Sequence, residues 1–118
     1  MHVTLGAVSP TSLQNPSDGE SSASIRARVE RSRVVQRRRF VRLPTVSCNA
    51  HAAGRWLLSH GAVDREAKAL VTSAMESLKL SARGYHRVLR VARTIADLEG
   101  SSAVCTDHVA EALRYRPR

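Results

Sequence analysis

The sequence predicts an all-α fold, a small bundle of four to five helices that follows a flexible N-terminal segment. Apolar residues recur with the i, i+3, i+4, i+7 spacing of a helix face over most of residues 49–115. Helix-capping residues and glycines separate these periodic stretches. Only the first twenty residues contain anything resembling a strand, and the whole length of 118 residues fits one small domain.

The N-terminal segment is expected to lack stable structure. His2-Val-Thr-Leu could form a strand, but few partner strands are visible for it. The stretch from Ser9 to Gly19 is rich in turn residues and reads as a linker. We therefore divide the chain into a flexible segment, residues 1–20, and a helical domain, residues 21–118.

The first expected helix starts at a cap on Ser21 or Ser22 and ends near Phe40 or Arg42, because Pro44 does not suit a helix interior. Its part after Gln36 has little apolar content and is expected to fray. A thin apolar stripe consists of Ile25, Val29, Val34 and Val35. Eight arginines accompany a single acid, Glu30, and they are Arg26, Arg28, Arg31, Arg33, Arg37, Arg38, Arg39 and Arg42.

A second helix is expected over residues 49–60, anchored by Trp56, Leu57 and Leu58, with Gly54 as a weak point. A third helix, residues 65–78, is capped by Asp64 and turns Ala67, Leu70, Val71, Ala74 and Met75 inward.

The fourth expected helix is capped by Ser81, runs to about Glu99 and ends at Gly100. A fifth, residues 107–114, is capped by Thr106 and packs through Val109, Ala110 and Leu113.

The fourth helix has two distinct faces. A core stripe follows helical spacing and consists of Tyr85, Val88, Leu89, Ala92, Ile95, Ala96 and Glu99. Arg83, Arg87, Arg90 and Arg93 are placed on the opposite side. Such a row of guanidinium groups suits anions, which could be nucleotide phosphates, nucleic acid, or carboxylates of a neighbouring subunit.

Two stretches carry a resemblance to a known family: Ser81-Ala-Arg-Gly-Tyr-His-Arg-Val-Leu-Arg-Val-Ala-Arg-Thr-Ile-Ala-Asp-Leu-Glu-Gly100 and His108-Val-Ala-Glu-Ala-Leu-Arg-Tyr115. They resemble the C-terminal end of magnesium-chelatase-like AAA+ ATPases, in the ComM/YifB branch. More weakly, Gly19-Glu-Ser-Ser-Ala-Ser-Ile-Arg-Ala-Arg-Val29 is similar to the segment that opens the lid domain of that family. His2-Val-Thr-Leu is similar to the last strand of the ATPase core.

The resemblance implies a lid domain that closes over ATP and Mg²⁺ in the intact parent and contacts neighbouring subunits of a ring. It places Arg83 at the position of the sensor-2 arginine, which reaches toward the γ-phosphate. It also implies that the parent acts on DNA. The chain contains no Gly-x-x-x-x-Gly-Lys-Ser/Thr loop and no apolar strand that ends in paired acids, so alone it should be no enzyme and hold no cofactor.

Two groups of arginines remain open to more than one interpretation. Arg87, Arg90 and Arg93 form either subunit or phosphate contacts, or a solvated face with salt bridges such as Arg93 to Asp97. Possible nucleic-acid contacts in the first helix are Arg31, Arg37, Arg38, Arg39 and Arg42. A stand-alone basic DNA-binding module, or a helical module that docks on an ATPase, is therefore the alternative function.

Composition limits the other possibilities. The net charge of +9 favours polyanionic partners, whereas 3% aromatic residues argue against a stacking platform for single strands. His86 and His108 lack a third ligand, so no metal site is expected. Cys48 and Cys105 show neither Cys-x-x-Cys spacing nor an obvious base partner. No signal peptide or membrane span is evident, which favours a cytoplasmic protein.

Overall fold

A computed structural model describes residues 1–14 and 19–116 of the chain. These residues form six α-helices and one 3₁₀ helix, and they contain no strand. In chain order the elements are α1 (Pro10–Gln14), α2 (Ser22–Arg39), η1 (Asn49–His51), α3 (Gly54–His60), α4 (Arg65–Ser77), α5 (Ala82–Glu99) and α6 (Thr106–Arg114). The predicted all-α fold is confirmed.

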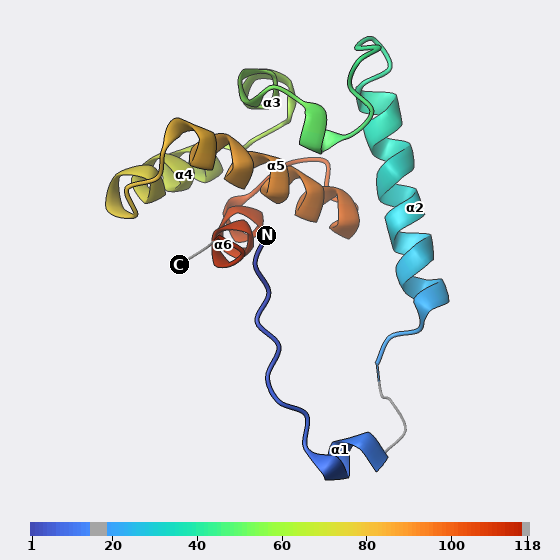
Figure 1. The fold of residues 1–118 in the computed structure, drawn as a ribbon. Coiled ribbons are helices and arrows are strands. Elements are labelled where there is room, and N and C mark those ends of the chain that lie inside the picture. The colour runs from blue at the N-terminus through green and yellow to red at the C-terminus, as the bar shows by residue number, and fades with distance from the viewer. Residues whose placement is uncertain (15–18, 117–118) are drawn as a thin grey trace.

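Helices α3 to α6 form the bundle, with α5 at its centre (Figure 1). Helix α5 contacts α3, α4 and α6 as well as α2, and α4 also packs on α6. The main core is rich in small aliphatic side chains because the helices approach each other closely. Its buried members are Val63, Ala67, Val71, Val88, Leu89, Ala92, Ile95, Ala96, Val104, Val109 and Ala112.

The ends of α5 explain why this helix has its length. The Ser81 hydroxyl accepts a hydrogen bond from the Gly84 N–H at 3.1 Å and so caps the N-terminus. Gly100 ends the helix in the left-handed conformation, at φ 77°. The Ser101 N–H then returns to the Ala96 carbonyl at 2.8 Å. Both ends match the sequence prediction.

The expected second helix is interrupted. Residues 49–51 form the 3₁₀ helix η1, extended backbone follows at Ala52 and Ala53, and α3 begins at Gly54. Gly54 is buried, and a Cβ atom built on it would lie 1.8 Å from Nδ1 of His86. This position therefore requires glycine because α3 and α5 meet there at close range.

Helix α6 differs from the prediction in two details. Its N-cap is Cys105, one residue before the expected Thr106. Ala112 is buried and Ala110 is exposed, so the packed face is shifted from the expected one.

Helix α2 packs in a way that its sequence did not predict. The expected stripe of Ile25, Val29, Val34 and Val35 is 37–42% exposed, whereas Ser32 and Gln36 are each 3% exposed. The end expected to fray is the anchored end, because Phe40 is buried against Trp56 and Leu57. The apolar-stripe prediction is wrong, since hydrogen bonds along the helix and the apolar contact of its C-cap Phe40 hold α2, and the stripe does not.

Most of residues 1–14 runs outside the bundle (Figure 1). Residues 1–9 form no regular element, α1 is a single short helix, and the possible strand at His2 is not formed. A backbone hydrogen bond connects the start of the chain to the bundle, since the His2 N–H donates to the Tyr115 carbonyl at 2.9 Å. In the described part of the chain, no helix is both long and apolar enough to cross a membrane.

Candidate functional site

The arginine row of α5 divides into two exposed and two engaged side chains. Arg83 lies in the first turn, two residues after the Ser81 cap, and is exposed. No residue of the described chain pairs with its guanidinium. The first turn of a helix leaves backbone N–H groups unsatisfied, so this end of α5 carries a partial positive charge in addition to Arg83. A free guanidinium fork at this place can meet an anion bidentately.

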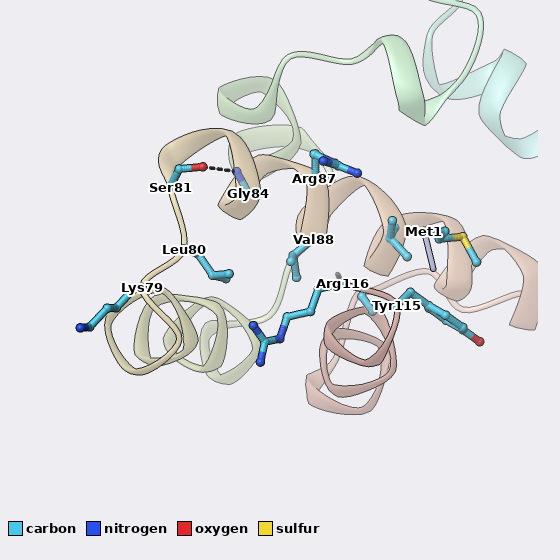
Figure 2. A pocket seen from close by; sticks show the side chains of 11 residues that line it. Met1, Lys79, Leu80, Ser81, Gly84, Arg87, Val88, Tyr115 and Arg116 are labelled. Carbon is cyan, nitrogen blue, oxygen red and sulfur yellow. Dashed lines mark hydrogen bonds between the residues drawn. The ribbon is translucent and has the colours of Figure 1, made fainter. Parts of the chain in front are cut away.

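Arg87 is exposed one turn further along α5 and borders two hollows. The first, about 250 Å³, opens between the turn before α5 and the end of α6. Figure 2 shows Leu80 and Val88 facing this space while Arg116 extends from the end of α6. The second hollow, about 410 Å³, has a largely apolar wall that includes Val91, Ile95, Leu98 and Tyr115.

Arg90 is half-buried and already holds a partner. Its Nε donates to the Ala52 carbonyl at 2.9 Å, which links α5 to the extended stretch between η1 and α3. Arg90 therefore combines a structural contact with a position on the rim of the second hollow.

Arg93 is not on the exposed face, and the prediction that placed it there is wrong. Its side chain is 1% exposed. The guanidinium donates to Asp97 at 3.1 Å, to the Gly61 carbonyl at 3.0 Å, and to the carbonyls of Ser101 and Ser102 at 2.7 and 3.0 Å. The i, i+4 pair with Asp97 is confirmed. All of these partners belong to the chain itself, so Arg93 holds the surrounding loops in place. Its guanidinium is not available to donate to a neighbouring molecule.

Asp97 is the centre of a buried polar network that the sequence analysis did not identify. Its carboxylate is fully buried and accepts two parallel hydrogen bonds from Arg39, one of them at 2.7 Å. Asn49 Nδ2 donates to it at 2.8 Å and to Thr94 at 3.1 Å. Burial raises the pKa of Asp97, but the bonds from Arg39 and Asn49 and the charge of Arg93 lower it below the usual 3.8.

The arginines proposed for nucleic acid, which lie in α2 and in the turn after it, are mostly free. Arg31, Arg37, Arg38 and Arg42 are exposed, and no residue of the described chain pairs with them. Arg39 is different, because it is paired with Asp97 and with Asn49 at 2.9 Å.

The two histidines have structural surroundings. His108 is 3% exposed, and its Nδ1 accepts the Cys105 backbone N–H at 2.9 Å while Nε2 lies 2.9 Å from Glu99. His86 contacts Gly54, and its Nδ1 is the one buried side-chain nitrogen or oxygen without a hydrogen bond among the described residues. Within that part of the chain, no group of three His, Cys, Asp or Glu side chains could hold a metal ion.

Both cysteines are free thiols. Cys105 does have a base nearby, contrary to the prediction, because its Sγ lies 3.3 Å from Nδ1 of His108. That nitrogen already accepts the backbone N–H, so the contact belongs to the helix cap. Burial raises the pKa of the Cys48 thiol. The backbone N–H groups of Ala50 and His51 and the Arg33 guanidinium lower it by more, so the net pKa lies below the usual 9.0.

The helical domain matches a known class of protein domains. The family described as magnesium chelatase, subunit ChlI C-terminal, matches residues 19–116. The chain belongs to this family, as the C-terminal domain of a magnesium-chelatase-like protein.

Within that family the chain belongs to the ComM/YifB branch. It is 38% identical over 106 residues to competence protein ComM of Haemophilus influenzae, a match that covers 89% of this chain and 20% of that protein. It is 35% identical over 103 residues to the uncharacterized protein YifB of Salmonella typhimurium, covering 87% of this chain and 19% of that protein. The chain therefore spans about a fifth of the length of these relatives.

Proposed function

We propose that this chain is the lid portion of a ComM-like AAA+ ATPase and that Arg83 is its sensor-2 arginine. The observation that carries the proposal is the position of Arg83, exposed and unpaired within the described residues, in the first turn of a rigidly capped helix. In the parent protein this guanidinium would meet the γ-phosphate of ATP–Mg²⁺ and stabilise the charge that develops during phosphoryl transfer. Arg87 and Arg90 would contact phosphate or a neighbouring ring subunit in the cytoplasm.

The test uses the intact parent. Arg83→Ala should lower ATP turnover at saturating ATP at least about tenfold, because transition-state charge loses a bidentate partner. Arg65→Ala is the matched control, since Arg65 is an exposed and unpaired arginine in the first turn of α4. Circular dichroism should show both variants folded. Unchanged turnover in Arg83→Ala would remove this residue from the mechanism.

The chain alone should not hydrolyse ATP, because it contains neither a phosphate-binding loop nor acids at a strand end for Mg²⁺. Sustained turnover by the purified chain, in fractions that coelute with it, would overturn the proposal. Comigration of the chain with a separately prepared ATPase core in gel filtration would favour a docking module instead.

A second candidate function is DNA contact through α2 and the turn after it. The observation that favours it is the exposure of Arg31, Arg37, Arg38 and Arg42 without partners in the described chain. Such contacts attract the phosphate backbone without reading sequence, so affinity should fall steeply with salt. Anisotropy of labelled duplex and forked DNA across a salt series tests this. Neutralising Arg37 and Arg38 should weaken binding and flatten the slope, whereas Arg65→Ala should change neither.

A further inference from the structure

Helix α2 meets the bundle with only one half of its length. Its inward face consists of residues 25, 29, 32 and 36, which share one side of a helix at 100° per residue. Ser32 and Gln36, near the C-terminal end, are buried, but Ile25 and Val29 on the same side are 42% and 41% exposed. Figure 1 shows why, because the N-terminal half of α2 extends beyond α5 toward α1.

The contact between α2 and the bundle is almost entirely polar. Gln36 Oε1 accepts the Asn49 backbone N–H at 3.0 Å across this contact, while within α2 the Gln36 Nε2 donates to Ser32 at 3.1 Å. Arg39 supplies the charged part of the contact through its paired bonds to Asp97. No apolar side chain between Ser22 and Arg39 is buried. When α2 separates from the bundle, water can replace such hydrogen bonds. Separating an apolar interface would instead cost free energy, because apolar surface would become exposed to solvent.

The bundle does not depend on α2 for its own core. Every buried member of the main apolar cluster lies between Val63 and Ala112. If Arg39 leaves, Asp97 keeps Arg93 and Asn49 as partners, so no lone charge is left in the interior. Phe40, packed against Trp56 at a ring-centroid distance of 5.0 Å, would still connect the end of α2 to α3.

We infer that α2 is an arm that can leave α5 while the bundle of α3 to α6 stays folded, and that the Arg39–Asp97 ion pair is the latch that holds it. Phe40 is the pivot. The latch acts on the orientation of α2 and is independent of whether Arg83 meets a nucleotide, so this inference goes beyond the proposed function.

Amide hydrogen exchange of the 118-residue chain, followed by mass spectrometry, tests the latch. Arg39→Met removes the pair, and the adjacent Arg38→Met removes the same charge from an exposed, unpaired side chain of the same helix. In Arg39→Met, peptides of α2 should exchange about tenfold faster or more, while peptides of α5 and α6 keep their protection. Arg38→Met should behave as the wild-type chain does.

Three results would overturn the inference. Joint loss of protection in α2 and α5 upon Arg39→Met would make α2 an integral part of the bundle. Unchanged protection of α2 would deny the ion pair a latching role. If Arg38→Met and Arg39→Met raised the exchange rate of α2 equally, the cause would be the loss of positive charge from the helix and not the loss of the ion pair. Arg39→Lys keeps the charge but loses the paired geometry, so its α2 exchange rate should lie between those of wild type and Arg39→Met.

Discussion

The contact between Gly54 and His86 is a constraint on a single residue with a measurable cost. A side chain at position 54 would overlap the imidazole, which also packs edge-on to Tyr85 at a centroid distance of 5.5 Å. Gly54→Ala should therefore lower the free energy of unfolding by about 1–3 kcal/mol through overpacking. Urea denaturation followed by circular dichroism measures this change.

Two further variants test whether overpacking causes the loss of stability. Gly6→Ala is the control, because a Cβ atom there has nothing within 4 Å. Adding His86→Ala to Gly54→Ala should recover part of the lost stability, since the clashing ring is gone. A Gly54→Ala chain as stable as wild type would mean that α3 and α5 are not in close contact at this point.

Single residues also show the limit of sequence reasoning at the candidate site. Arg83 and Arg87 are exposed as helical periodicity predicted, whereas Arg93 occupies the same nominal face and is buried. Periodicity predicts on which face of the helix a residue lies, but it does not reveal which loops fold back over that face. The loop carbonyls of Gly61, Ser101 and Ser102 cover Arg93. The i, i+4 spacing to Asp97 was the only local signal of this network.

Among the elements, α5 offers two glycines with opposite expected effects. Gly100→Ala should cost about 1 kcal/mol, because residue 100 has φ 77°, a conformation that alanine adopts poorly. Gly84→Ala should be neutral or stabilising by up to about 1 kcal/mol, since Gly84 is helical and an added methyl meets only ordinary contacts, the nearest at 3.6 Å. Thermal unfolding of both variants tests the pair. Effects of the same sign would contradict the assigned end of α5.

The start of α2 and both ends of α5 were predictable because their signals are local. Ser21, Ser81 and Gly100 lie at the expected ends. The interruption at Ala52 and Ala53 was not predictable from propensity, since both residues favour helices. It lies next to the close approach of α3 to α5 at Gly54, and there the Ala52 carbonyl accepts a hydrogen bond from Arg90. The packing of α2 was missed for a related reason, because apolar patterns cannot identify an interface made by Ser32, Gln36 and Arg39.

For the whole molecule, Asp97 predicts sensitivity to acid. Burial raises its pKa, but Arg39, Asn49 and Arg93 bring the folded-state value below 3.8. A depressed folded-state pKa stabilises the protein fully above the unfolded value, and the stabilisation is lost as pH falls through the folded value. The free energy of unfolding should therefore fall as pH is lowered below the usual pKa of an aspartate, about 4. Urea titrations of Trp56 fluorescence at each pH measure this loss.

Arg39→Met should reduce that acid sensitivity, because the carboxylate that remains has fewer partners to lose. Asp107→Asn is the control, since Asp107 is an exposed acid in the first turn of α6. If the wild-type chain were equally stable at pH 2 and pH 5, folding would not lower the pKa of the buried Asp97 carboxyl.

The polar contact between α2 and the bundle also affects how the chain responds to denaturant and heat. The urea m value and the heat-capacity change of unfolding both grow with the apolar surface that unfolding exposes. Helix α2 supplies 18 residues but no buried apolar side chain, so its release adds little to either quantity. Calorimetry should therefore assign this chain the heat-capacity increment of a protein appreciably shorter than 118 residues.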